Sequence, residues 1–330
     1  MSISCAVLGT GYWGKNILRN LDALGALSGF FDSDAEARAA FGAQYPNATV
    51  YDSVDAVLAD PSIPAVAIAT PAETHGTLVR QALNAGKNVF VEKPLCLEVE
   101  EARELEALAR EKGAILMVGH LLLYHPAFLA LKQAVADGAI GRLRYIYSNR
   151  ASLGKIRRNE NALWSFAPHD ISMMLALTGR MPDKVVCNGE AWLSPSVADM
   201  TLSHFDFGDQ LQGHIFVSWL HPYKDHRLVV VGESGMLVFN DTLPGEDKLL
   251  RYPHAIGWKD DLPVMDKAEA EPVPYGTEEP LRTEMEHFLD CCATAKTPRS
   301  DAAEGVRVLS VLDMCQRSLD TKAPVMLEQS

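Results

Sequence analysis

The 330-residue sequence has no apolar run that approaches the roughly 18 to 20 residues needed to cross a bilayer, and we expect no membrane-spanning helix. Its first residues, Met1–Gly9, have neither the basic segment nor the cleavage site of a secretory signal, so we expect a strand there. A basic surplus is also missing, because 30 Lys and Arg stand against 43 Asp and Glu, a net charge of −13. Nucleic-acid-binding proteins usually carry such a surplus or a strongly basic face, so DNA and RNA are poor candidate partners.

Cysteine patterns that bind metal or build disulfide frameworks are missing as well. The six cysteines form no Cys-x-x-Cys pair, and the ten histidines do not cluster with cysteines or carboxylates at ligand spacing. Cys291 and Cys292 are adjacent on a predicted helix, which makes them a poor disulfide pair. We therefore expect no metal and reduced, mostly buried thiols, as in a cytoplasmic protein.

The first 120 residues alternate short, uninterrupted apolar runs with helical stretches, and this pattern predicts a parallel sheet covered by helices on both faces. Ser53 is placed to cap one of these helices, and Gly113 to end another. Because the length suggests two domains, we assign residues 1–121 to this doubly wound domain. The predicted strands are Ile3–Leu8, Gly29–Phe31, Thr49–Tyr51, Ala65–Thr70, Asn88–Val91 and Ile115–Val118.

In residues 122–330 most predicted strands follow one another without a helix between them, which predicts an α+β domain with a large, open, mainly antiparallel sheet. Helices are expected over Pro126–Ala136, Leu281–Thr294 and Ala302–Ser318, and Asp241–Pro280 is expected to be surface loop with a strand or two. Helices on one face of such a sheet leave the other face to be covered, so we expect self-association through this sheet. The predicted strands are Leu143–Asn149, Val185–Leu193, Met200–Phe207, Gln210–Trp219, Arg227–Val231 and Met236–Phe239.

A glycine pattern lies between the first predicted strand and the first predicted helix. The segment Gly9-Thr10-Gly11-Tyr12-Trp13-Gly14 has the spacing G-x-G-x-x-G, which lets backbone approach a pyrophosphate at a helix N-terminus in a Rossmann domain. Asp32 ends the second strand 21 residues after Gly11, where a carboxylate binds ribose hydroxyls and repels a 2′-phosphate. The pattern therefore predicts NAD as the cofactor. A structural turn with a helix-capping Asp is the alternative, and Arg38 is expected on a solvated helix face.

A lysine follows a buried strand in the segment Phe90-Val91-Glu92-Lys93-Pro94. Ligands of open α/β sheets lie outside the carboxyl ends of the strands, so Lys93 is placed to meet one. Burial disfavours the charged amine, and a lysine in that setting can exchange a proton with a hydroxyl group or donate to an alkoxide. The alternatives are a lysine that reaches solvent or pairs with Glu92.

Four segments stand out together: Gly9–Gly14, Thr70-Pro-Ala-Glu-Thr-His75, Glu92-Lys93-Pro94 and Phe166-Ala-Pro-His169-Asp-Ile171. With them the chain resembles the glucose–fructose oxidoreductase and inositol dehydrogenase (Gfo/Idh/MocA) family of NAD(P)-dependent sugar oxidoreductases. The resemblance spans nearly the whole chain, and it implies dimers or tetramers formed through the C-terminal sheet. It also implies that Lys93 contacts the reacting hydroxyl and that Thr70, Pro71, His75 and Glu92 line the cofactor cleft.

His169 matches the histidine of the family pattern Asp-x-x-x-His, but Ser165 stands at the position of the Asp. A serine cannot supply the carboxylate that would orient the imidazole by charge. Asp170 is an alternative orienting group, although adjacent residues on a helix do not face each other. His169 with an ordinary pKa suits a base near neutral pH.

A basic segment precedes this histidine. Gly138–Asn159 has six basic residues and no acidic one, in a chain that is otherwise strongly acidic. Such a segment favours an anionic ligand, and arginine forks suit phosphate oxygens; a strand edge protected by positive charge is the alternative. The predicted substrate-binding residues are Arg150, Lys155, Arg157, Arg158, Trp164, Ser165 and His169, and Arg142 and Arg144 complete the basic segment.

The segment Gly154–Ile171 is similar to a branch of the family found in cell-surface polysaccharide pathways, the UDP-N-acetylglucosamine 3-dehydrogenases. The resemblance predicts NAD-dependent oxidation of the 3-hydroxyl of a UDP-linked sugar, with His169 taking the hydroxyl proton and Lys93 stabilising the alkoxide, or with these roles exchanged. A dehydrogenase of a free polyol such as inositol is an alternative that leaves the basic segment unexplained. A non-catalytic dinucleotide-sensing regulator is a second alternative, against which the presence of both Lys93 and His169 argues.

Overall fold

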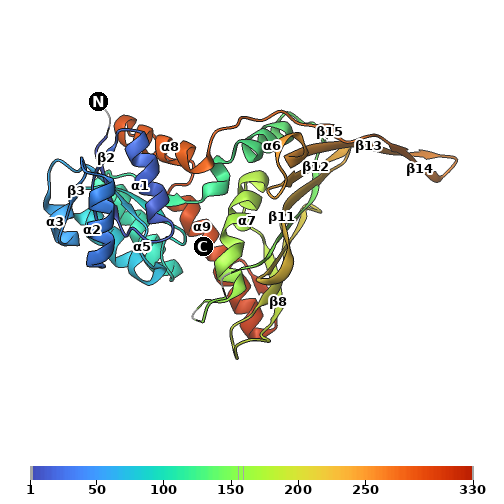
Figure 1. Ribbon diagram of the computed structural model, residues 1–330. Coiled ribbons are helices and arrows are strands. Elements are labelled where there is room, and N and C mark those ends of the chain that lie inside the picture. Colours follow the sequence, from blue (N-terminus) through green and yellow to red (C-terminus); the bar gives the residue numbers. More distant parts are fainter. Residues whose placement is uncertain (1–2, 155, 159, 329–330) are drawn as a thin grey trace. The chain divides into compact units, whose positions relative to one another are not determined.

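The computed structural model describes residues 3–154, 156–158 and 160–328, and the chain divides into two compact units (Figure 1). Unit 1 comprises Met1–Tyr124 and Glu278–Leu309, and unit 2 comprises His125–Thr277 and Ser310–Ser330. The first change of unit lies close to the boundary expected from the sequence at residue 121. The return of Glu278–Leu309 to unit 1 is not predicted by the sequence pattern.

Unit 1 is built on a six-stranded parallel sheet with the order β3-β2-β1-β4-β5-β6, which confirms the predicted doubly wound domain. The order reverses between β1 and β4, where a ligand crevice forms outside the carboxyl ends of the strands. The strands are β1 Cys5–Leu8, β2 Leu27–Phe31, β3 Thr49–Val50, β4 Ala65–Ile68, β5 Asn88–Glu92 and β6 Leu116–Gly119. The helices between them are α1 Gly14–Ala23, α2 Ala35–Gln44, α3 Val54–Ala59, α4 His75–Asn84 and α5 Val99–Lys112, with the short 3-10 turns η1 Ala72–Thr74 and η2 Leu121–Tyr124.

Local capping sets the ends of several of these helices. The side chain of Asp34 accepts a hydrogen bond from Glu36 N at 2.9 Å at the start of α2. Ser53 Oγ accepts from Ala56 N at 3.0 Å at the start of α3, as the sequence predicts. Helix α5 ends at Gly113, whose φ of 62° is the left-handed conformation expected of a terminating glycine.

Two C-terminal helices complete unit 1. The Phe288 ring of α8 (Pro280–Thr294) lies 5.9 Å from the Phe90 ring of β5. Helix α9 (Ala302–Thr321) begins against β6, because a Cβ at Gly305 would lie 2.7 Å from Val118 Cγ2. The chain continues from this start of α9 into unit 2.

Unit 2 is built on a ten-stranded, mainly antiparallel sheet with the order β14-β13-β12-β11-β7-β10-β9-β8-β16, in which β7 and β10 are parallel and β15 pairs with β13. The predicted α+β class is confirmed. The strands are β7 Leu143–Leu153, β8 Lys184–Glu190, β9 Met200–Asp206, β10 Gln212–Ser218, β11 Leu220–Gly232, β12 Gly235–Asn240, β13 Leu249–Lys259, β14 Leu262–Lys267, β15 Glu271–Pro272 and β16 Val325–Met326. The helices are α6 Pro126–Ala136, α7 Ala162–Thr178, the 3-10 turn η3 Gly245–Lys248 and the second part of α9.

The helices of unit 2 pack on one face of this sheet (Figure 1). A Cβ at Gly213 of β10 would lie 2.8 Å from Met174 Sδ of α7, and Cys187 N of β8 donates to Ser318 Oγ of α9 at 2.9 Å. Tyr145 and Tyr147 point to the opposite face, because side chains alternate along a strand. The opposite face of the sheet is therefore the one without helices over the described residues.

Candidate active site

The glycine loop between β1 and α1 contains three glycines, and the fold requires a glycine at two of these positions. Gly9 has a φ of 88°, and a Cβ there would lie 2.9 Å from Ala69 O. A Cβ at Gly14 would lie only 2.0 Å from Gly9 O, so helix and loop could not approach as they do. A Cβ at Gly11 would meet nothing within 4 Å. Gly11 therefore leaves open space at the place where a pyrophosphate approaches the backbone.

The N-terminus of α1 has the properties of an anion site. No side chain caps it, and no acidic residue lies in its first turn, so its amides and helix dipole favour a negative group. Tyr12 and Trp13 border it with exposed fractions of 75% and 38% and an edge-to-face ring contact at 5.8 Å. The loop fits the pyrophosphate of a dinucleotide.

Asp32 lies directly after β2 and is fixed against the glycine loop. Its Oδ2 accepts hydrogen bonds from Thr10 N at 2.6 Å and Thr10 Oγ1 at 2.9 Å, and its Oδ1 accepts from Asp34 N at 2.9 Å. Burial alone would raise the pKa of Asp32, but these hydrogen bonds and the charge of Arg38 lower that pKa below its usual value. The carboxylate is therefore ionised and held beside the loop, where a ribose is expected.

The side chain of Arg38 does not extend into solvent as the sequence suggests, but contacts the end of β2. Its Nη1 donates to the backbone oxygen of Asp32 at 2.7 Å, and its guanidinium lies 5.8 Å from the centre of the Phe31 ring. The guanidinium is therefore fixed close to Asp32, whose role in the choice between NAD and NADP stays a prediction.

The segment after β4 is tied to the segment after β5 by His75. This imidazole is 1% exposed, with Nε2 at 2.9 Å from Thr70 O and Nδ1 at 2.7 Å from Pro94 O. Burial lowers the pKa of His75, against the effect of the two carbonyls. Thr70 Oγ1 lies 2.7 Å from Thr74 Oγ1, whose hydroxyl donates to Pro71 O at 2.8 Å. His75 therefore fixes the backbone of both segments, and its contact with the cofactor stays a prediction.

Lys93 follows β5 directly, and its peptide bond to Pro94 is cis. The side chain is half-buried, next to Glu92. Burial raises the pKa of Glu92 to about 7, while the charge and backbone amide of Lys93 and the charge of His120 oppose the rise. The amine thus stands beside a carboxyl group that titrates near neutral pH.

His169 lies in the middle of α7, four residues after Ser165, so both residues are on one face of the helix. Ser165 is buried and His169 is half-buried. Asn161 caps the helix by accepting from Trp164 N at 3.1 Å, and the indole Nε1 of Trp164 donates to Gln316 Oε1 at 3.0 Å. Helix α7 therefore holds the three predicted site residues in one short segment of unit 2.

Asp170 accepts hydrogen bonds from Arg150 and Ser148 through its two carboxylate oxygens. Its Oδ2 accepts from Arg150 Nε at 2.6 Å, and its Oδ1 accepts from Ser148 Oγ at 2.5 Å. Arg150 is only 7% exposed and also points Nη1 at His226 Nδ1, 3.4 Å away. The orientation of His169 by Asp170 stays a prediction, and Arg150 lies in the interior of unit 2 instead of on a basic surface.

The basic segment does not form a single cationic surface. Arg142 and Arg144, at the start of β7, both pair with Glu233, at 3.2 Å and 2.8 Å. The eleven residues of β7 separate them by about 30 Å from the residues that follow the strand. There Arg157 pairs with Glu160 at 2.6 Å, Arg158 is exposed, and Lys155 lies outside the described residues. Only this second group is next to α7 in the chain.

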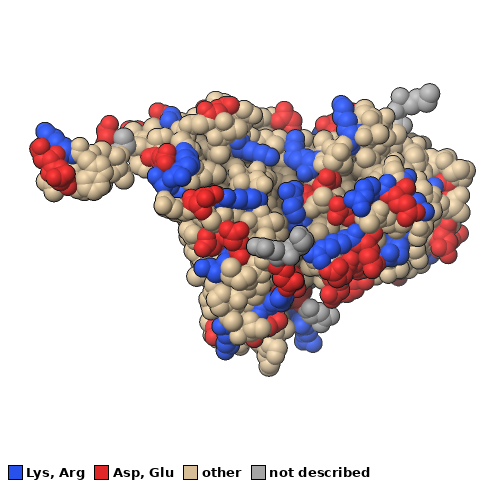
Figure 2. Space-filling view, turned by 180° about the vertical axis from the view of Figure 1, so that it is seen from behind, with Lys and Arg blue, Asp and Glu red and all other residues tan. Residues whose placement is uncertain are grey.

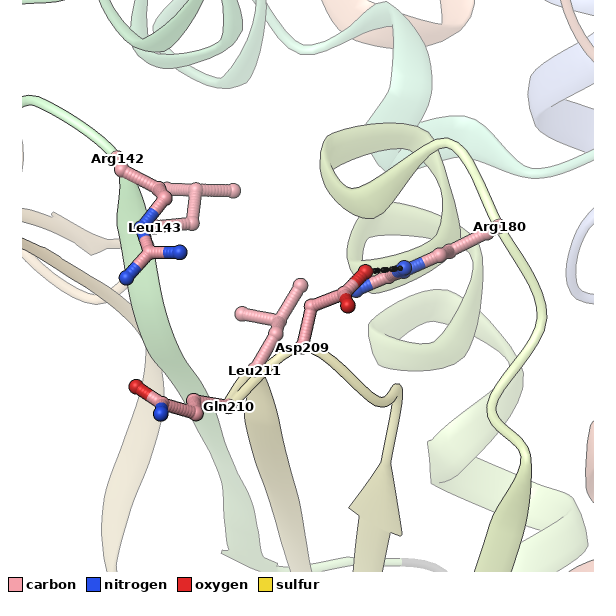
Figure 3. Close-up of a pocket in the computed structure, with 6 residues that line it drawn as sticks. All are labelled: Arg142, Leu143, Arg180, Asp209, Gln210 and Leu211. Atoms are coloured by element: carbon pink, nitrogen blue, oxygen red, sulfur yellow. Dashed lines mark hydrogen bonds and ion pairs between the residues drawn. The ribbon is translucent and has the colours of Figure 1, made fainter.

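A hollow of about 590 Å³ lies at the start of β7. Figure 3 shows the residues that line it, which come from the start of β7, the segment after α7 and the β9–β10 turn. Its cations are compensated, because Arg180 pairs with Asp209 at 2.7 Å and Arg142 pairs with Glu233. This hollow is therefore not the anion site expected from the basic segment. The lining residues are Arg142, Leu143, Arg180, Asp209, Gln210 and Leu211.

A buried pair and a buried carboxyl group in unit 1 are not predicted by the sequence. His120 Nδ1 lies 2.5 Å from Glu304 Oε2, and Glu284 of α8 is 1% exposed. His120 and Glu304 are 184 positions apart in the chain, so no local pattern could have indicated their contact. Among the described residues, no group of three His, Cys, Asp or Glu could hold a metal ion.

Comparison with known proteins agrees with this geometry. The family profile "Oxidoreductase family, NAD-binding Rossmann fold" matches residues 3–120, and the profile "GFO/IDH/MocA C-terminal domain" matches residues 128–238. The chain belongs to the Gfo/Idh/MocA family. The family assignment covers both units, and the glycine loop and Asp32 lie within its NAD-binding part.

Two relatives of this family member are dehydrogenases by name. The chain is 30% identical over 309 residues to the UDP-N-acetylglucosamine 3-dehydrogenase of Acidithiobacillus ferrooxidans, covering 92% of this chain and 93% of the relative. A solved structure of a protein of that name and organism superposes with a TM-score of 0.86 at 27% identity, over 97% and 98% of the two chains. The scyllo-inositol 2-dehydrogenase (NAD(+)) of Bacillus subtilis is 27% identical over 286 residues, covering 82% and 80%.

These findings make the protein an NAD-dependent oxidoreductase that acts on a CH–OH group. The predicted cofactor is confirmed, and so is the family named from the sequence motifs. Over the described residues, the structure contains no helix that is both long and apolar enough to span a bilayer.

Proposed function

We propose that the protein oxidises the 3-hydroxyl of a UDP-linked sugar, UDP-N-acetylglucosamine, to the 3-keto sugar with NAD+. The observation that carries this proposal is the near full-length similarity to a UDP-N-acetylglucosamine 3-dehydrogenase, in which more than nine-tenths of both chains are covered. The product would be a keto sugar ready for amination in cell-surface polysaccharide or lipid A synthesis.

In this proposal unit 1 binds the cofactor. The open face of Gly11 and the uncapped N-terminus of α1 accept the pyrophosphate, and Asp32 accepts hydrogen bonds from the adenosine ribose. Thr70, Pro71 and Glu92 border the same carboxyl edge of the sheet, at the ends of β4 and β5. Bound NAD+ supplies the acceptor for the hydride that leaves the sugar carbon.

Two side chains handle the hydroxyl group. The His169 imidazole takes the hydroxyl proton, and the Lys93 ammonium stabilises the oxygen as it becomes negative. Ser165 stands where the family pattern has a carboxylate, and the carboxylate of Asp170 is shared with Arg150.

The diphosphate of the substrate is assigned to the end of the basic segment nearest α7. Arg157 and Arg158 are exposed just before Trp164, whose indole is fixed by Gln316. Lys155 belongs to the same stretch of sequence. Arg150 is left out of the substrate site, because its guanidinium is buried against Asp170.

A free polyol is the second candidate substrate. The similarity to a scyllo-inositol 2-dehydrogenase favours it, and so does the ion pair of Arg157 with Glu160, which reduces the positive charge offered to a phosphate. Of the two candidate substrates, only the UDP-sugar carries a diphosphate, so only the UDP-sugar needs a strong anion-binding site.

Self-association through the sheet of unit 2 is proposed as well. The hairpin of β13 and β14, here called the arm, projects from the sheet (Figure 1), with charged atoms at its tip (Figure 2). Directly paired residues share a face, so Ile256, Met265, Trp258 and Pro263 form the apolar outer part of one face of the arm. His254 and Lys267 lie on the same face, nearer the sheet. The same register continues this face across the sheet through Tyr252, Met236, Val231 and Tyr145. A second copy of the chain would cover this continuous surface in a homodimer or homotetramer.

All six cysteines are free, and burial raises the pKa of each of them. Free and mostly buried thiols support the proposal of a reducing, cytoplasmic compartment.

The test is a substrate panel with product analysis. The protein is incubated with NAD+ and, separately, with UDP-N-acetylglucosamine, UDP-N-acetylglucosamine carrying deuterium at C3, and scyllo- and myo-inositol. We expect reduced cofactor with the UDP-sugar, a product lighter by two hydrogens, and deuterium recovered in the cofactor. Oxidation of inositol with no turnover of any UDP-sugar would establish the alternative.

A further inference from the structure

Unit 1 contains a cluster of four titratable side chains: Glu92, His120, Glu284 and Glu304. Of these, only Glu92, at the edge of the cluster, has a role in the proposed function. They come from four elements: β5, the end of β6, α8 and α9. His120 and Glu284 are each 1% exposed, and Glu304 is 5% exposed. We call this set the carboxyl cluster.

The sheet register places one end of the carboxyl cluster directly beside Lys93. Glu92 pairs with Gly119 of β6, and a Cβ at Gly119 would lie 3.2 Å from Glu92 Oε2. The residue after Gly119 is His120, whose Nδ1 lies 2.5 Å from Glu304 Oε2. The start of α9 is held there by its close packing on β6 at Gly305.

Glu284 brings a third carboxyl group into the same interior. It lies one helical turn before Phe288, on the face of α8 that packs on Phe90. Neither of its carboxyl oxygens has a hydrogen-bond partner among the described residues, and neither does Glu304 Oε1. Burial raises the pKa of Glu284, and the charges of Glu92 and Glu304 raise it further. A carboxylate without partners is costly in such a place, so burial favours the protonated form of Glu284.

The charge of Glu284 also acts on Tyr124, on whose ring Arg299 and His287 pack. Tyr124 of η2 donates to or accepts from Ser300 Oγ at 3.0 Å, and burial and Glu284 both raise its pKa. Arg299 lies over the Tyr124 ring at 4.7 Å and donates to Leu123 O. His287 Nε2 accepts from Arg299 N, and burial lowers the pKa of His287.

The charge of Glu284 is coupled to that of Glu92, because the charges of Glu92 and Glu304 both raise the pKa of Glu284. Glu92 directly precedes Lys93, and the charge of Lys93 acts on Glu92 in turn. A change of charge at Glu284 therefore changes the electrostatic potential at the Lys93 amine.

We propose that the carboxyl cluster controls the charge of the Lys93 amine, with Glu284 as its exchangeable-proton site. The inference rests on the proposed function, in which Lys93 faces the reacting oxygen. The O–H proton goes to His169 and the C–H electron pair goes to NAD+ as hydride, while Lys93 keeps its proton and stabilises the oxyanion. When the solution becomes alkaline, Glu284 loses its proton, and the new negative charge opposes loss of the proton from Lys93. Glu284 is thus a positioning residue that acts through Lys93.

The test measures the reactivity of Lys93 itself, without sugar or cofactor. Trace acetylation of the full-length protein is followed by mass spectrometry of the Lys93 peptide between pH 7 and 11, in wild type, Glu284→Gln and Glu279→Gln. Glu279 is a matched control, since it lies near the start of α8 but pairs with Arg19 at the surface. We expect the midpoint of the labelling curve to fall by about 0.5 to 1 pH unit in Glu284→Gln only. A midpoint equal to that of wild type overturns the proposal.

Two further measurements separate the possible failures. Glu284→Met must shift the labelling midpoint in the same direction, which covers the case that the Gln variant does not fold. The alkaline limb of kcat against pH must move with the labelling midpoint. A labelling shift without oxidation of any sugar would contradict the proposed function and leave the control of Lys93 standing. Sugar oxidation with an unchanged midpoint would contradict the control of Lys93 alone.

Discussion

Arg150 and Asp170 form a buried ion pair in unit 2, with Nε 2.6 Å from Oδ2. Removing the guanidinium leaves a buried carboxylate uncompensated, which typically costs about 3 to 5 kcal/mol. We expect Arg150→Met to lower the Tm by about 5 to 15 °C, with the KM for UDP-N-acetylglucosamine changed less than about twofold. Thermal unfolding and steady-state kinetics check this prediction.

The matched control is Arg157→Met, an exposed arginine of the same basic segment. We expect it to raise the KM for the UDP-sugar by about tenfold, equivalent to the loss of roughly 1.4 kcal/mol of binding, with no change in Tm. A raised KM in Arg150→Met at an unchanged Tm would indicate that Arg150 binds the substrate after all.

Asp32 should determine the choice between NAD and NADP. Asp32→Asn keeps an acceptor for Thr10 but removes the charge that repels a 2′-phosphate, and Arg38 is held nearby. We expect the ratio of kcat/KM for NAD to that for NADP to fall by at least about tenfold. Because the pKa of Asp32 is lowered, NAD binding by wild type should stay constant from neutral pH down through moderately acidic pH. An unchanged cofactor ratio contradicts this role.

Glu284 should make the protein less stable as the pH rises. Its pKa is higher in the folded protein than the ordinary value of 4.5, so the folded state binds more proton than the unfolded chain. Stability therefore falls as the pH rises above about 4.5 and continues to fall until the folded-state pKa is passed. We expect Glu284→Gln to match wild type near pH 4.5 and to have a Tm several degrees higher at pH 8 to 9. Equal pH dependence of the Tm in the two proteins would show that Glu284 is ionised in the fold.

The arm should contribute to association between copies of the chain. Trp258 is 74% exposed and lies on the apolar face that continues onto the sheet, whereas Leu262 is 67% exposed and pairs with Lys259 on the other face. We expect Trp258→Asp to weaken the oligomer by at least about tenfold and Leu262→Asp to leave it intact. Light scattering after size-exclusion chromatography over a concentration series measures this. Equal weakening by both variants would contradict the prediction that association depends on the face that carries Trp258 and not on the opposite face.

Much of unit 1 follows from local sequence. The strand, the G-x-G-x-x-G loop and the helix after it are contiguous, and the clash at Gly14 and the position of Asp32 are consequences of that short segment. The cap by Ser53 and the left-handed Gly113 are equally local. Such features are set by residues within one turn or one strand, so a single sequence predicts them.

The parts that could not be predicted depend on residues far apart in the chain. Arg150 belongs to a basic run, and only the packing of α7 on the sheet shows that Asp170 neutralises it. His120 and Glu304 meet because the start of α9 packs on β6. The arm arises from a segment rich in Pro, Gly and charge, whose strands are stabilised by pairing and not by an alternating apolar pattern.

The most direct test of the account is the turnover of Lys93→Ala and His169→Ala with UDP-N-acetylglucosamine and NAD+, measured beside cofactor binding. The account predicts that each variant binds NAD as wild type does and loses about 10²-fold or more in kcat, because each side chain acts on the hydroxyl group. Turnover near the wild-type rate in both variants would contradict it.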